Sequence, residues 1–177
     1  MSVRIFAVLI VAMWLAMLGT VADVEGAEKK LIKFKLEDRD GKMRTEKEFK
    51  GKPLIAFASD KGGSKYSDAW ITGIQTGLKE KEGTRPAAVL AVADLSAIPS
   101  LMRGAVKRVL PKPEKLSLIL DWEGVFDKAY GFKENKCNIL VFSNSGVLMF
   151  QGAVTKVDDE KVGEIVAMIA KEQQNES

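Results

Sequence analysis

The chain has 177 residues, a formal net charge of +3 and no histidine. A charge this small does not indicate a nucleic-acid partner. The lack of histidine excludes histidine metal sites, Ser-His-Asp triads and Cys-His dyads. Cys137 is the single cysteine, so no disulfide can form within one chain. We therefore expect one domain that holds no metal and no other cofactor.

Residues 1–22 predict a secretory signal peptide. Arg4 is the one charge in this segment, an unbroken apolar stretch runs from Ile5 to Leu18, and small residues follow up to Ala22. We expect cleavage after Ala22, which gives a periplasmic or secreted protein. The alternative is an uncleaved membrane anchor, because a spanning helix needs about 20 apolar residues and this segment falls only slightly short.

Two strands are expected before the first helix of the mature chain. Ile32, Phe34 and Leu36 alternate with charged residues between Glu28 and Leu36, which predicts a half-buried strand. The continuous apolar run from Leu54 to Ala58 predicts a central strand that is buried on both faces.

A glycine turn and a helix follow the central strand. The turn is residues 60–64, Asp-Lys-Gly-Gly-Ser, in which two adjacent glycines permit a tight bend. Apolar residues spaced by four predict a helix from about Lys65 to Glu80, in which Gly73 and Gly77 favour a close approach to the sheet. A turn just past the carboxyl end of a central strand is where α/β proteins place their active sites.

The second half of the chain alternates between apolar strands and helices. Pro99 opens a short helix whose apolar rows are Leu101/Ala105/Val109 and Met102/Val106. Its basic face, Arg103, Lys107 and Arg108, is either solvated or binds a partner or an anionic surface. The remaining expected elements are strands at 87–93 and 116–120, a hairpin at 138–152, a helix capped by Asp158 or Asp159, and a flexible tail at 173–177.

Three segments resemble redoxins. Residues 49–53 have the pattern F-x-G-K-P, residues 121–132 have D-x-x-G-x-h-x-x-x-Y-G-h (h, apolar), and residues 138–152 resemble the closing hairpin. The chain thus resembles the thioredoxin-like redoxin (AhpC/TSA-like) superfamily, and most closely the periplasmic YtfJ-type family, which lacks the active-site cysteines. The resemblance implies an α/β fold over residues 28–172, a three-layer α/β/α sandwich with a central mixed sheet.

The same resemblance locates a degenerate active site. Lys61 and Ser64 stand where redoxins have their two cysteines, and Cys137 stands at the position of a cis-proline. This register implies that Cys137 lies beside the 60–64 turn and that exchange with a resolving cysteine is impossible. We therefore expect a non-redox binding or accessory module, whose partner is a periplasmic protein, a peptide or a small anion.

Cys137 leaves three interpretations open. It is a small buried residue at the start of a strand, or it forms a disulfide-linked dimer. Alternatively it is the thiol of a single-cysteine peroxidase or transferase. That role needs a thiol with a lowered pKa. Lys61, Lys133, Lys136 or the N-terminus of the helix after Gly63 could lower it.

The turn residues also carry alternatives. Lys61 could form a Schiff base in a desolvated pocket, although the tip of a glycine loop favours exposure. Ser64 is predicted to be a helix N-cap, because no histidine can activate it. The backbone N–H groups of Gly62, Gly63 and Ser64 could bind an anion at the helix start, or the loop is simply solvated.

Overall fold

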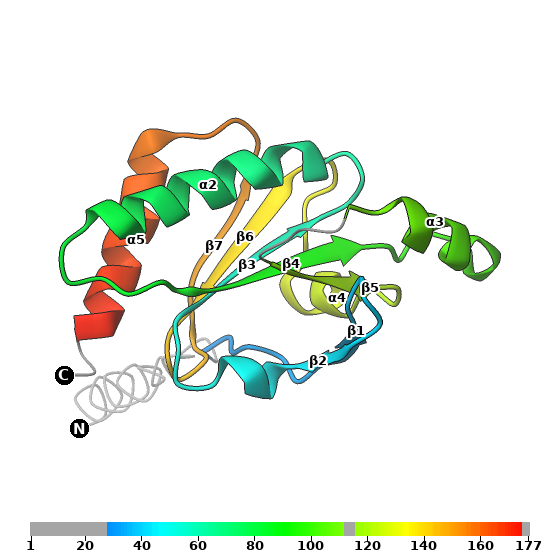
Figure 1. The fold of residues 1–177 in the computed structure, drawn as a ribbon, viewed down its shortest axis with the longest axis horizontal. Helices are drawn as coiled ribbons and strands as arrows, with labels where there is room; N and C mark the ends of the chain where they lie inside the picture. Colours follow the sequence, from blue (N-terminus) through cyan, green and yellow to red (C-terminus); the bar gives the residue numbers. More distant parts are fainter. Residues whose placement is uncertain (1–27, 112–115, 175–177) are drawn as a thin grey trace, which may run out of the picture.

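The computed structural model describes residues 28–111 and 116–174, so the predicted signal peptide lies outside the described residues. Figure 1 shows a central sheet between helices. The elements in chain order are β1 (Lys35–Glu37), β2 (Met43–Thr45), η1 (Glu46–Phe49), β3 (Leu54–Ser59), α2 (Ser64–Glu80), β4 (Ala88–Asp94), η2 (Ser100–Met102), α3 (Arg103–Val109), β5 (Ser117–Asp121), α4 (Val125–Tyr130), β6 (Cys137–Phe142), β7 (Leu148–Val154) and α5 (Asp159–Gln174).

The main sheet has five strands in the order β5-β4-β3-β6-β7. Strands β3, β4 and β5 are parallel, whereas β6 runs antiparallel to β3 and β7 antiparallel to β6. All six residues of β3 are buried, which confirms the predicted central strand. Strands β1 and β2 form a separate two-stranded sheet.

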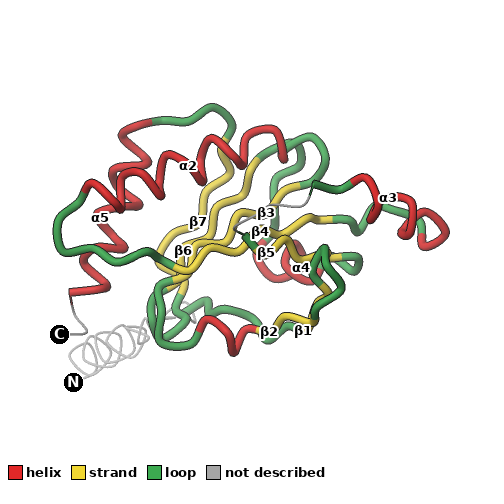
Figure 2. The backbone as a smooth tube through the Cα atoms, viewed as in Figure 1, coloured by secondary structure: helices red, strands yellow, loops and turns green. Residues whose placement is uncertain are grey.

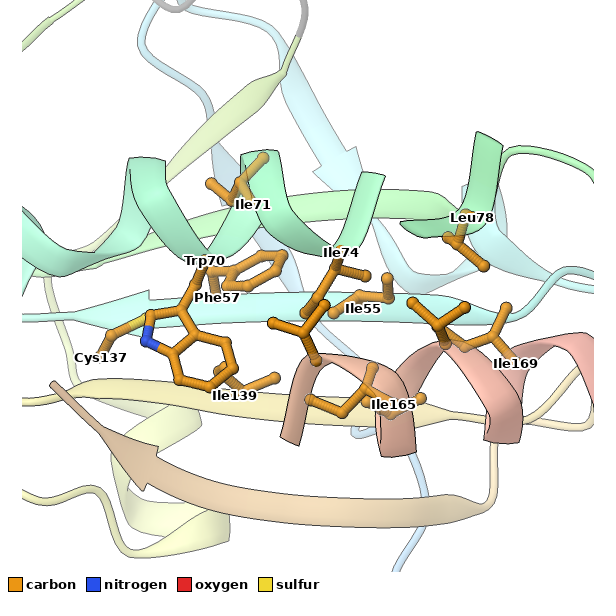
Figure 3. Packing of buried hydrophobic residues seen from close by; sticks show 13 residues of the cluster. Ile55, Phe57, Trp70, Ile71, Ile74, Leu78, Cys137, Ile139, Ile165 and Ile169 are labelled. Carbon is orange, nitrogen blue, oxygen red and sulfur yellow. The ribbon is translucent and has the colours of Figure 1, made fainter. Parts of the chain in front are cut away.

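Alternate residues of β3 face two different cores. Ile55 and Phe57 point to α2 and α5, whereas Leu54 and Ala56 pack with Phe126 of α4 on the other face. Figure 3 shows the first of these cores between α2, α5 and the sheet. The predicted three-layer sandwich with a mixed sheet is therefore confirmed.

The prediction of a strand between Glu28 and Leu36 is mostly wrong, because most of these residues do not belong to a regular strand. Only Lys35–Glu37 is a strand, and Lys30 forms an isolated bridge to Val147. Side chains take the place of a ladder partner, because the Tyr130 hydroxyl accepts a hydrogen bond from the N–H of Ile32 (3.0 Å) and donates one to the carbonyl of Lys30 (2.8 Å).

The two glycines of α2 serve a different contact from the predicted one. A Cβ atom at Gly77 would lie 2.9 Å from Cγ2 of Val166, and one at Gly73 would lie 3.4 Å from Cγ2 of Val162. Both valines belong to α5, so the glycines allow two helices to approach each other rather than the sheet.

The C-terminal helix confirms one prediction and corrects another. Asp158 caps α5, since its carboxylate accepts a hydrogen bond from the N–H of Lys161 at 3.2 Å. The predicted tail is wrong at Gln173, which is buried in α5. Its side-chain amide accepts from the N–H of Arg85 (2.7 Å) and donates to the Arg85 carbonyl (2.8 Å). Residues 175–177 lie outside the described residues.

Among the described residues, no helix has the length and apolar character needed to cross a bilayer.

Candidate functional site

The turn after β3 and the loop before β6 meet at one end of the sheet. Ala58 pairs with Asn138 in the antiparallel ladder between β3 and β6, so Cys137 begins its strand where β3 ends. The side chain of Cys137 lies next to α2, and the hydroxyl of Ser67 lies 3.6 Å from its sulfur. The predicted juxtaposition of Cys137 with the 60–64 turn is confirmed.

Asp60 holds the two loops together. One carboxylate oxygen accepts a hydrogen bond from the N–H of Gly63 (2.7 Å), and the other accepts from the N–H of Asn135 (2.8 Å). A single side chain thereby fixes both the turn and the loop. Sequence reasoning placed Asp60 in the turn but did not foresee its bond to a residue 75 positions later.

The paired glycines are needed because the loops lie in contact. A Cβ atom at Gly63 would overlap the carbonyl oxygen of Lys136, and one at Gly62 would overlap the side-chain oxygen of Asn135. The φ angle of Gly63 is −82°, which any residue adopts, so space rather than backbone conformation requires glycine there.

Lys61 and Ser64, at the redoxin cysteine positions, are both exposed. Exposure leaves Lys61 without the desolvated surroundings that a Schiff-base lysine needs. Ser64 is not the N-cap that was predicted, because α2 begins at Ser64 and its cap residue is Gly63. The Ser64 hydroxyl donates to the carbonyl of Lys61 (3.0 Å), a bond that closes the turn.

The predicted anion site at the start of α2 lacks two of its three donors. The N–H of Gly63 bonds to the carboxylate of Asp60, and the N–H of Ser64 bonds to the Asp60 carbonyl at 3.0 Å. A carboxylate already occupies the place of an external anion, so the turn is closed upon itself.

Cys137 is a buried thiol with 0% exposure, at the edge of the core beside Trp70 (Figure 3). Burial raises the pKa of Cys137 to about 11, and the hydrogen bond from Ser67 offsets only part of this effect. Lys61, Lys133 and Lys136 are exposed and do not lower the pKa as the one-thiol interpretation required. The same burial keeps the sulfur out of reach of a second chain, against a disulfide-linked dimer.

A pocket of about 400 Å³ opens beside this junction, at the carboxyl ends of β3 and β4. We call it the strand-end pocket. Phe132 and Ala97 give it an apolar wall, and its charged lining residues are Asp60, Asp94, Asp127, Glu134 and Lys133. Four carboxylates against one ammonium make the pocket acidic. Among the described residues, no three or more His, Cys, Asp or Glu side chains are grouped so that they could hold a metal ion.

Asp94 and Asp127 were missed from sequence. Asp94 ends β4 and accepts from the N–H of Ser96 (3.0 Å), whereas Asp127 lies in α4 and accepts from the N–H of Phe132 (2.7 Å). The position of Asp94 at a strand end was a usable signal. No comparable signal marks Asp127, which lies within α4 and lines the pocket together with Phe132, the residue whose N–H it binds.

The predicted basic face lies on α3, at the end of the molecule farthest from α5 in Figure 1. Arg103 pairs with Glu123 at 2.9 Å and lies over the ring of Trp122. Lys107 pairs with Glu37 at 2.5 Å, while Arg108 has no ion pair among the described residues. The three cations therefore share a helix but not one electrostatic environment.

Comparisons with solved structures identify the fold. The chain is similar to the pneumococcal exposed lipoprotein thioredoxin Etrx1 of Streptococcus pneumoniae, with 16% identity and a TM-score of 0.59 over 77% of this chain and 99% of that one. It is also similar to a protein assigned as the thiol:disulfide interchange protein DsbE of Chlorobium tepidum, with 17% identity and a TM-score of 0.59 over 81% and 96% of the two chains.

A third similar structure is a SCO1/SenC family lipoprotein of Bacillus anthracis, with 14% identity and a TM-score of 0.56 over 81% and 96% of the chains. No family model matches the chain, and no curated protein matches it in sequence. At these identities the likeness shows the fold alone, which is thioredoxin-like. The finer resemblance to the YtfJ-type family stays a prediction.

Proposed function

We propose that this protein is a non-redox binding or accessory module with a thioredoxin fold, which acts through the strand-end pocket and not through a thiol. The state of Cys137 carries this proposal, because this cysteine has 0% exposure and its thiol has a pKa raised to about 11. Thiol chemistry requires an accessible thiolate, and this site provides neither the access nor the charge.

The proposed location is the periplasm or the space outside the cell. The signal-peptide pattern of residues 1–22 supports it, and the structural neighbours include two lipoproteins. The match of residues 121–132 to the redoxin pattern, without either active-site cysteine, is what a YtfJ-type protein would have.

Charge favours one class of ligand for the pocket. The pocket has an apolar wall, and its lining includes four carboxylates, from Asp60, Asp94, Asp127 and Glu134, but only one ammonium group. A protein or peptide segment with lysine or arginine side chains complements that lining, whereas a small anion would be repelled.

The absence of redox activity is tested with insulin-reduction and peroxide-consumption assays on the purified protein and its Cys137→Ala variant. We expect equal, background rates for both proteins. Turnover by the wild type above the variant in either assay would falsify the proposal and support a single-cysteine thiol peroxidase or transferase.

The rate of alkylation of Cys137 against pH tests the physical reason. Only the thiolate reacts, and a pKa of about 11 makes its population at neutral pH roughly a hundredfold smaller than that of a thiol at the ordinary 9.0. We expect the alkylation rate of the folded protein to keep rising at pH values where the rate of the denatured chain has already reached its plateau. A rate that reaches its plateau near neutral pH would reinstate the one-thiol enzyme.

Ligand class is tested by fluorescence anisotropy with a labelled lysine-rich peptide and its glutamate-rich counterpart. The lysine peptide should bind more tightly, and Glu134→Lys should weaken it while the matched variant Glu164→Lys, on the exposed face of α5, should not. Equal binding by both peptides, or equal effects of both variants, would exclude the pocket as a site for basic segments.

A further inference from the structure

Exposed apolar side chains concentrate on η2 and α3. Five large hydrophobic residues are exposed in the described chain, and three of them lie in this segment. Leu101 is 96% exposed, Val109 80% and Met102 52%. Single exposed hydrophobic residues are ordinary, but a cluster on one short element marks an interaction surface.

The structure divides the two apolar rows of this segment. Val106 and Leu110 pack against the core residues Ala93, Leu95 and Leu120, and so hold the segment on the end of the sheet. The row Leu101/Ala105/Val109, with a spacing of four residues, is left facing solvent. Figures 1 and 2 show α3 projecting beyond the ends of the strands, so this row lies on a convex edge of the molecule.

Positive charge surrounds the exposed row. Residues 100–110 contain three cations, Arg103, Lys107 and Arg108, and no acidic residue. Arg39 adds a fourth, because its guanidinium donates to the carbonyls of Leu110 (3.1 Å) and Arg108 (3.3 Å). Glu123 and Glu37 balance only two of the four cations, which leaves a net positive edge.

We propose that this edge, Leu101, Met102, Ala105, Arg108 and Val109, binds the surface of an anionic lipid bilayer. A short amphipathic segment with aliphatic tips and basic neighbours inserts its apolar row at the level of the headgroups, where anionic lipids meet the cations. The site is separate from the strand-end pocket and independent of its ligand.

Shape and charge favour a bilayer over the other occupants of such a surface. A convex row of aliphatic tips needs no matching groove in a bilayer, whereas a protein partner must supply one. A second copy of the chain would set Arg108 and Arg39 against their own counterparts, so like charges would meet across the contact. The segment is only about three turns long, and we therefore expect weak, reversible binding.

Co-sedimentation of the full-length protein with vesicles tests the proposal. We expect binding to vesicles of phosphatidylglycerol mixed with phosphatidylcholine, little binding to phosphatidylcholine alone, and weakening by salt. Replacing the two most exposed tips, Leu101→Gln with Val109→Gln, should lower the partition coefficient roughly tenfold. Val157→Gln, which changes an exposed valine that precedes α5, is the matched control and should leave binding unchanged.

A fluorescent label on this edge reports contact with the bilayer at the proposed site itself. It does so even if the apolar N-terminal segment of the full-length protein also binds the vesicles. A polarity-sensitive fluorophore on Leu101→Cys should shift to the blue when anionic vesicles are added, and the same label on Val157→Cys should not. No shift at residue 101, or equal binding by the double variant, overturns the proposal. Lipid-free self-association in sedimentation equilibrium that the double variant abolishes would overturn it in favour of a second copy.

Discussion

Two turns in this protein share the pattern D-x-x-G and do different work. Asp60 to Gly63 connects β3 to α2, and Asp121 to Gly124 connects β5 to α4. In each turn both carboxylate oxygens of the aspartate accept backbone N–H groups. Asp121 accepts hydrogen bonds from Val125 and Phe126, both at 2.9 Å and both in the first turn of α4.

The difference lies in where the second hydrogen bond goes. Asp121 spends both oxygens on starting α4, whereas Asp60 divides them between its own turn and Asn135. The glycines differ in the same way, because Gly124 is needed for its φ of +63° and Gly63 for the space that Lys136 occupies. The turn at Asp121 stabilises only the helix that follows it. The turn at Asp60 also binds the loop before β6, which leads into Cys137.

The largest expected effect is at Asp121, which has 0% exposure. Asp121→Ala removes two charge-assisted hydrogen bonds from buried groups, and we expect a loss of about 4 kcal/mol in the free energy of unfolding. Urea denaturation measures it. Asp121→Asn keeps one acceptor oxygen and should lose about half as much. A loss below ~1 kcal/mol in the alanine variant would show that α4 does not depend on this cap.

The next effect is at Gly63, where an added methyl group would overlap the carbonyl of Lys136. We expect Gly63→Ala to destabilise the fold by about 2–3 kcal/mol, because the two loops must separate to admit it. Gly104→Ala is the matched control, since a Cβ there meets open space. It should stabilise α3 by up to about 1 kcal/mol. Equal thermal midpoints for both variants would mean that the loops are not in firm contact.

The smallest change in stability, about 1–2 kcal/mol, is expected for Asp60→Ala, because Asp60 is only partly buried. Its sharper readout is access to Cys137. Loss of the bond to Asn135 frees the loop, and the alkylation rate of the folded protein should rise roughly tenfold as local opening becomes easier. Asp94→Ala removes a carboxylate whose hydrogen bond, among the described residues, is to the nearby N–H of Ser96, and it should leave that rate unchanged. An unchanged rate in Asp60→Ala would place the barrier to Cys137 in the core instead.

Most of the fold could be predicted because hydrophobic periodicity reports burial directly. The run from Leu54 to Ala58 and the spacing of Trp70, Ile74 and Leu78 matched a buried strand and a core-facing helix face. The failure at residues 28–34 has a physical cause. Alternation there did report burial, but the N–H groups of Ile32 and Phe34 bond to a tyrosine hydroxyl and a glutamate carboxylate, partners that periodicity does not encode.

The site was predictable in position but not in chemistry. The register placed Cys137 beside the 60–64 turn, as the pairing of Ala58 with Asn138 confirms. The pKa of Cys137 depends on how completely Trp70 and its neighbours cover the sulfur. The hydrogen bonding of the Gly63 N–H depends on where the Asp60 carboxylate points. Both are properties of packed side chains, which the order of residue types leaves open.

The hydroxyl of Tyr130 links the start of the described chain to a residue that is synthesised much later. It bonds to Ile32 and Lys30, partners 98 and 100 residues earlier, and the nearby N–H of Leu31 bonds to the carbonyl of Gly146. The first part of the described chain to be synthesised thus waits for partners that are made late. Until Tyr130 and then the β6–β7 turn have been made, the backbone of residues 29–32 lacks these hydrogen-bond partners, so we expect this early segment to be ordered late in folding.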